Sequence, residues 1–152
     1  RKDFMVEDYQ IFEARAHGAD VVLLIVAALC DAQLDDMYSL ARSLGMRVLV
    51  ETHTPEELER ALASDAELIG VNARNLKTLD VDLHYACALL ESVPSDRLAV
   101  GESAVATIRD VEAYARAGAD AVLVGEALVR HADPTKAARD FCSVERQRRA
   151  GR

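Results

Sequence analysis

The chain has 152 residues, of which 51% are apolar and 29% are charged, and its formal net charge is −8. This balance supports a folded core and argues against disorder. The acidic excess disfavours nucleic acid or an anionic membrane as the main partner. The longest apolar run, residues 21–30, is too short to span a bilayer. Three scattered cysteines without metal-binding spacing favour reduced thiols. We therefore expect a cytoplasmic protein.

Six mostly apolar runs predict β-strands along the chain. They are residues 2–6, 21–27, 47–51, 68–72, 98–102 and 121–125. Runs that are mostly apolar, rather than alternating with polar residues, indicate strands buried on both faces, as in a parallel sheet. The strand starts are about 20–30 residues apart, which is the size of a βα unit.

Segments with helical spacing lie between these strands. The clearest are residues 8–17, 34–44 and 107–117. Thr54-Pro55 and Asp133-Pro134 each combine a capping residue with a proline suited to a first helical turn. Successive βα units without a G-x-G-x-x-G motif leave two architectures open. One is an open doubly wound sheet, and the other is most of a (β/α)₈ barrel.

Polar residues stand at or beside the ends of the predicted strands. Four of these strands contribute Lys2, Glu51, Asn72 and Glu102, with Asp3, Arg74 and Ser103 beside them. In a barrel, the carboxyl ends of the strands carry the active site. A lysine and a glutamate in a partly dry pocket suit acid–base catalysis, although a lysine can also form a Schiff base. At the last strand, residues 125–128 suit a phosphate-binding loop or a simple tight turn.

The remaining polar residues are interpreted more simply. His53 follows Glu51 but is interpreted as a loop residue, and the other histidines have no metal spacing. We expect no metal and no cofactor. The basic residues of segment 143–152 are interpreted as a solvated tail after a catalytic region of residues 1–142. These basic residues are Arg146, Arg148, Arg149 and Arg152.

At these positions the sequence strongly resembles the indole-3-glycerol phosphate synthase family, from residue 1 to about residue 142. The stretches that carry the resemblance are residues 1–6, 18–25, 49–53, 69–78 and 122–130. Residues 2–4 and 72–78, taken together in this order, are much more specific than the Gly-Ala-Asp and Leu-Val-Gly-Glu segments, which many phosphate-binding barrels have. The resemblance implies a (β/α)₈ TIM barrel, of which the chain covers about six βα units, strands 3 to 8. It also implies conversion of 1-(2-carboxyphenylamino)-1-deoxyribulose 5-phosphate, with loss of CO₂ and water and without a cofactor. The implied partner is therefore a small phosphorylated substrate.

The resemblance also implies roles for individual residues. The catalytic residues would be Lys2, Glu51, Asn72 and Glu102. The substrate-binding residues would be Phe4, Arg74 and Ser103. The phosphate-binding residues would be Ala104, Gly125 and Glu126. Lys2 would act as the general acid for ring closure, and Glu51 would act in the later dehydration.

The sequence departs from the family pattern at several points, of which two bear most on activity. Ala104 replaces a glycine that is usual in the family, and the first two βα units, with a glutamate and a second lysine, are not in this sequence. We therefore expect the isolated chain to be poorly active. We also expect it to associate through sheet edges at residues 2–6 and 121–125. The alternatives are another phosphate-binding barrel enzyme, such as phosphoribosylanthranilate isomerase, and an inactive barrel fragment.

Overall fold

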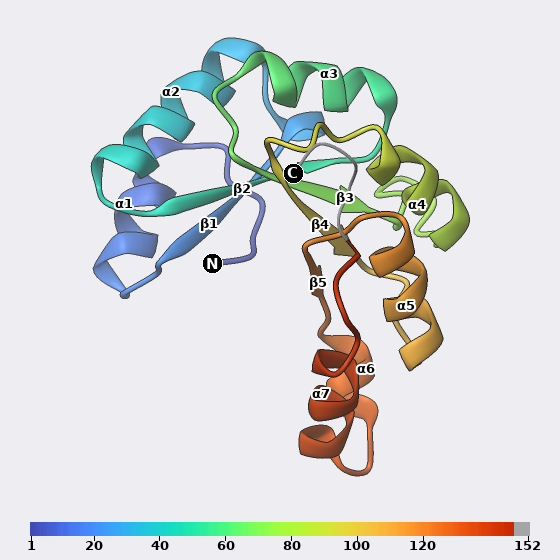
Figure 1. Cartoon of the computed structure of the whole chain (residues 1–152). Helices are drawn as coiled ribbons and strands as arrows, with labels where there is room; N and C mark the ends of the chain where they lie inside the picture. Colours follow the sequence, from blue (N-terminus) through green and yellow to red (C-terminus); the bar gives the residue numbers. More distant parts are fainter. Residues whose placement is uncertain (148–152) are drawn as a thin grey trace. The chain divides into compact units, whose positions relative to one another are not determined.

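The computed structural model describes residues 1–147 (Figure 1). The chain forms two compact units, Arg1–Gly70 and Val71–Arg152. Strand β3 (Leu68–Asn72) includes the boundary between them. None of the described helices is long and apolar enough to cross a membrane.

The first unit alternates helices and parallel strands. Its elements are α1 (Asp8–Ala16), β1 (Val21–Ile25), the 3₁₀ turn η1 (Val26–Ala28), α2 (Asp31–Ser43), β2 (Arg47–Thr52), α3 (Pro55–Ala63) and the start of β3. Strands β1 and β2 are parallel, with Val21 opposite Arg47 and Ile25 opposite Glu51. This register places Glu51 at the carboxyl end of the β1–β2 pair.

The second unit continues the alternation. After the end of β3 it contains α4 (Leu83–Glu91), β4 (Leu98–Glu102), α5 (Ile108–Arg116), β5 (Ala121–Leu123), α6 (Glu126–Arg130) and α7 (Pro134–Cys142). Strands β4 and β5 are parallel, and Glu102 pairs with Leu123. Glu102 therefore occupies the carboxyl end of this pair, as Glu51 does in the first unit.

The order of the strands distinguishes the two predicted architectures. Neighbouring strands follow the chain, β1-β2-β3 in the first unit and β3-β4-β5 in the second. A doubly wound sheet reverses its strand order at a switch point, whereas a (β/α)₈ barrel keeps the order of the chain. The strand order therefore favours the barrel.

The predicted strand at residues 2–6 is wrong, because the structure describes no strand there. The Gln10 side chain forms hydrogen bonds with backbone groups of this segment and of the next residue. Its Oε1 accepts from Val6 N–H at 2.7 Å and from Glu7 N–H at 3.1 Å, and its Nε2 donates to the Phe4 carbonyl at 2.9 Å. These groups are thus bonded without a ladder, and Met5 is buried. The predicted association edge at residues 2–6 therefore does not exist as a strand.

Several predicted boundaries agree with the structure, and others shift. The helix starts at Thr54 and Asp133 are confirmed, since each side chain accepts a hydrogen bond from a first-turn N–H. Strand β1 ends at Ile25 and β5 ends at Leu123. The sequence did not predict α4, whose cap is Asp82.

The segment after α7 is described only as far as residue 147. There Arg146 Nη1 pairs with Asp120 Oδ1 at 2.8 Å. The other basic residues of the predicted tail, Arg148, Arg149 and Arg152, lie outside the described residues.

Candidate active site

Buried polar side chains lie at the carboxyl ends of three strands. Within residues 1–147, the buried polar or charged residues are Glu51, Thr52, Asn72 and Glu102. All four lie at the carboxyl end of β2, β3 or β4. Thr52 has a structural partner, because its hydroxyl donates to the Gly70 carbonyl at 2.9 Å. Burying a charge or an amide is costly, so each of the other three is a candidate for chemistry, since barrel enzymes carry their active-site residues at the carboxyl ends of strands.

Lys2 and Glu51 are brought together although they are far apart in the sequence. Lys2 Nζ lies 2.9 Å from Glu51 Oε2. The lysine side chain is 53% exposed, whereas that of Glu51 is 1% exposed. A buried carboxylate that faces a reachable ammonium group is suited to proton transfer. Phe4, two residues after Lys2, is exposed and free to line a binding surface.

His53 contacts this pair, which the sequence interpretation discounted. Its Nε2 lies 3.2 Å from Glu51 Oε1, and its Nδ1 lies 3.1 Å from Glu57 Oε2. Glu57 Oε2 also accepts the His53 backbone N–H at 2.7 Å. Because Glu57 stands in the first turn of α3, this helix holds the loop that follows β2.

These contacts shift the pKa values of both residues. Burial alone would lower the pKa of His53, but hydrogen bonds and charge from Glu51 and Glu57 raise it from 6.5 to about 9. Burial would likewise raise the pKa of Glu57, but His53, with a contribution from Arg60, lowers it overall. At neutral pH His53 is therefore an imidazolium between two carboxylates.

The raised pKa of His53 predicts a pH dependence of stability. Its folded value of about 9 lies above its ordinary value of 6.5. Protonated His53 therefore stabilises the fold fully below about pH 6.5, and this contribution is lost as pH rises through 9. We expect the unfolding free energy to fall more steeply between pH 6.5 and 9 in the wild type than in His53→Gln. Urea unfolding at several pH values measures this, and equal slopes would contradict the assignment.

Asn72, Arg74 and Ser103 form a second group, in the second unit. Ser103 Oγ donates to Asn72 Oδ1 at 2.7 Å, and the Arg74 backbone N–H donates to the same oxygen at 3.0 Å. The ends of β3 and β4 are also joined, since Ala73 N–H donates to the Glu102 carbonyl at 2.9 Å. Asn72 is thereby held by neighbours that the sequence assigned to the same site.

The loop after β4 has an unusual backbone. Ser103 and Ala104 both have positive φ, 63° and 57°. This left-handed conformation costs a residue with a Cβ roughly 1–2 kcal/mol, whereas glycine adopts it freely. The glycine usual in the family would therefore fit at Ala104 without strain.

Replacing Ala104 with glycine should stabilise the protein by about 0.5–1 kcal/mol, because relief of strain exceeds the entropy cost of glycine. Ala106, nearby in the same loop and without positive φ, supplies the control. Ala106→Gly should lower stability by roughly 0.5–1 kcal/mol. Chemical denaturation of the two variants measures the difference, and a loss of stability in both would show that Ala104 is not strained.

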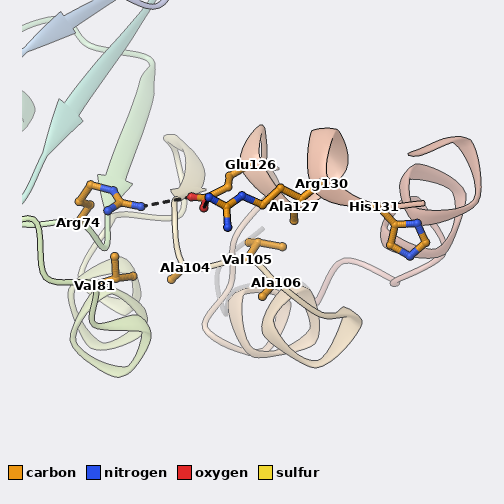
Figure 2. Close-up of a pocket in the computed structure, with 9 residues that line it drawn as sticks. All are labelled: Arg74, Val81, Ala104, Val105, Ala106, Glu126, Ala127, Arg130 and His131. Atoms are coloured by element: carbon orange, nitrogen blue, oxygen red, sulfur yellow. Dashed lines mark ion pairs between the residues drawn. The ribbon is translucent and has the colours of Figure 1, made fainter. Parts of the chain in front are cut away.

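A cavity of about 450 Å³ lies in the second unit. It is lined by Arg74, Val81, residues 104–106, Glu126, Ala127, Arg130 and His131. Figure 2 shows Arg74 directed toward Glu126. The Glu126 carboxylate lies 3.7 Å from Arg74 Nη2 and 3.2 Å from Arg130 Nη2. Arg130 was given no role from the sequence, although it stands four residues after Glu126 on α6.

The three residues that the sequence predicts to bind phosphate lie at or beside this cavity. Ala104 and Glu126 line this cavity, whereas Gly125 caps α6. A carboxylate repels a phosphate, so Glu126 would contribute through its backbone and by orienting the arginines. Arg74 and Arg130 also line the cavity, and both face the Glu126 carboxylate.

The backbone of Glu102 is held by the side chain of a buried tyrosine. Glu102 is 1% exposed, and its backbone carbonyl accepts a hydrogen bond from Tyr114 Oη at 3.0 Å. Burial raises the pKa of Tyr114, and nearby negative charge adds to this effect. The hydroxyl therefore stays protonated and remains a hydrogen-bond donor. No cluster of three potential metal ligands occurs within the described residues.

Comparison with known proteins decides the family. A model of the indole-3-glycerol phosphate synthase family matches residues 1–141. The chain belongs to this family. It is 60% identical over 141 residues to the indole-3-glycerol phosphate synthase of Micrococcus luteus, covering 93% of this chain and 53% of the relative. It is 57% identical over 144 residues to that of Arthrobacter sp. strain FB24, covering 95% and 53%.

This synthase-family chain thus spans about half the length of the curated relatives it matches. Among solved structures, a 3-hexulose-6-phosphate synthase from Salmonella typhimurium aligns with a TM-score of 0.78 and 19% identity. The alignment covers 93% of this chain and 69% of that chain. At this identity the likeness shows the fold alone. The α/β fold of the TIM-barrel class is confirmed.

Proposed function

We propose that the whole protein containing this chain is an indole-3-glycerol phosphate synthase of tryptophan biosynthesis. This carbon–carbon lyase would convert 1-(2-carboxyphenylamino)-1-deoxyribulose 5-phosphate into indole-3-glycerol phosphate, CO₂ and water. Family membership supports the activity. The contact between Lys2 and Glu51 is the observation that best supports this chemistry, because the reaction requires both a proton donor and a proton acceptor. A cytoplasmic location fits such a biosynthetic enzyme.

In this proposal, Lys2 donates a proton to the ketose oxygen as the aromatic ring attacks the carbonyl carbon. Loss of the carboxylate as CO₂ then returns its bonding electrons to the ring and neutralises the cation. Glu51 and Glu102 stabilise positive charge and exchange protons during the dehydration that releases water. Asn72 and Ser103 orient the substrate through their shared hydrogen bond, and Phe4 contacts its aromatic ring. No step requires a cofactor.

The phosphate would bind in the cavity beside residues 104–106, where Arg74 and Arg130 contribute charge. Guanidinium groups bind phosphate through paired, charge-assisted hydrogen bonds. Residues 1–142 would form the catalytic part, with residues 143–152 as a basic tail. Self-association would use the remaining predicted edge, β5, where Ala121 and Leu123 are exposed.

The test uses a completed protein, meaning this chain joined to the part of the Micrococcus luteus relative that it does not cover. Supplied with the carboxyl-labelled substrate, the completed protein should release one CO₂ for each indole ring formed, detected by absorbance. Turnover of phosphoribosylanthranilate without CO₂ release would favour the isomerase. Turnover of neither substrate by the folded protein would favour the inactive fragment.

A further inference from the structure

His53 links two carboxylates that come from different elements. Glu51 lies at the end of β2, and Glu57 lies in the first turn of α3. The His53 ring, 11% exposed, places one nitrogen 3.2 Å from Glu51 Oε1 and the other 3.1 Å from Glu57 Oε2. The proposed reaction gives this ring no role.

The arrangement determines the protonation state of the ring. Neutral imidazole has one N–H donor and one lone pair. A neutral ring here would leave one nitrogen without a proton beside a carboxylate oxygen, which is repulsive. The imidazolium donates a hydrogen bond from Nδ1 to Glu57 and places its positive charge 3.2 Å from Glu51 Oε1, so it suits both carboxylates. The pKa of His53, raised to about 9, likewise favours the imidazolium form at neutral pH.

The contacts also fix the orientation of Glu51. His53 faces Oε1 of its carboxylate, and Lys2 Nζ lies 2.9 Å from Oε2. One cation is thus buried and anchored through Glu57, while the other is half exposed and able to meet a substrate. Glu51 would keep its plane and its charge through His53 even when Lys2 turns toward the substrate.

We propose that His53 is a positioning residue for Glu51: anchored by Glu57, its imidazolium holds the Glu51 carboxylate in place and ionised beside Lys2. This inference rests on the proposed synthase function. The charged groups facing the ring are Glu51 from β2 and Glu57 from α3, with Lys2 on the far oxygen of Glu51. Loss of the His53 proton at alkaline pH would release Glu51.

The kinetic test compares the completed protein with its His53→Gln, Glu57→Gln and His17→Gln variants. Glutamine can donate a hydrogen bond but carries no charge, so His53→Gln should lower kcat about 10- to 100-fold with little change in KM. In the wild type, kcat should fall as pH rises through about 9. In Glu57→Gln this fall should move to lower pH, because one of the two carboxylates that hold the proton is gone. His17 is an exposed residue at the end of α1 and serves as the control.

Lysine side chains ordinarily lose their proton at alkaline pH too, and His53→Gln separates a contribution of Lys2 from one of His53. An unchanged alkaline fall in that variant would assign the fall to Lys2 and overturn the proposal. Equal kcat in His53→Gln and the wild type would also overturn it.

A second measurement does not require activity. The His53 ring signals, followed by NMR in the completed protein, should titrate near pH 9 and at lower pH in Glu57→Gln. The Glu51 carboxyl signal should take up its proton at higher pH in His53→Gln but not in His17→Gln. Titration of His53 near 6.5, or an unchanged Glu51, would overturn the inference even if the completed protein made no indole. If both NMR results hold without turnover, only the proposed function fails.

Discussion

Replacing Lys2 with methionine should lower kcat of the completed protein about 10²- to 10⁴-fold, the usual contribution of a positioned general acid. Methionine keeps an apolar stem but removes the ammonium that lies 2.9 Å from Glu51 Oε2. The proton donor for ring closure is then absent. Steady-state kinetics with indole absorbance as the readout measures the loss.

Lys136 supplies the control for this variant. It pairs with Asp140 on the exposed surface of α7, and the sequence assigns it no role in the candidate site. Lys136→Met should keep kcat within about twofold, because an exposed ion pair contributes little. A loss of less than about tenfold in Lys2→Met would remove Lys2 from the role of general acid.

Replacing Gly101 with alanine should destabilise the protein by about 3 kcal/mol, at the upper end of the usual cost of overpacking. A Cβ at this position would lie 2.4 Å from Cδ1 of the Tyr114 ring. Tyr114 is fully buried and its hydroxyl holds the Glu102 carbonyl, so the ring cannot move without losing that bond. Urea unfolding gives the change in unfolding free energy.

Two further variants, Gly125→Ala and Tyr114→Leu, test whether the loss of stability in Gly101→Ala comes from a clash with the Tyr114 ring. A Cβ at Gly125 meets no atom within 4 Å, so Gly125→Ala should change stability by less than about 0.5 kcal/mol. Because the clash is with the ring, Gly101→Ala should cost less in a Tyr114→Leu background, as a double-mutant cycle shows. Equal effects of Gly101→Ala and Gly125→Ala would contradict the close packing.

The sequence predicts best those features that depend on local patterns. The runs at residues 68–72 and 98–102 match β3 and β4, because uninterrupted apolar residues favour buried strands. The strand at residues 2–6 fails for a non-local reason. There the Gln10 side chain forms hydrogen bonds with backbone groups that would otherwise pair with a neighbouring strand.

In the candidate site, too, residues with a local sequence pattern could be predicted, whereas residues that depend on non-local contacts could not. Glu51, Asn72 and Glu102 stand out in the sequence because polar residues end several predicted buried strands in succession, and all three are buried. His53 could not be assigned in this way. Its role depends on Glu57, one helical turn later, and on the burial of both side chains, which no periodic pattern records. The left-handed backbone of Ala104 is likewise visible only in the structure.

The most direct test of the account is the rate of indole-3-glycerol phosphate formation by the completed protein, with Glu51 intact and with Glu51→Gln. The glutamine has nearly the same shape but has lost the charge that faces Lys2 and His53. The account predicts turnover with Glu51 and a loss of at least about 100-fold with glutamine. Equal turnover in the two proteins, or a folded completed protein that forms no indole, would contradict it.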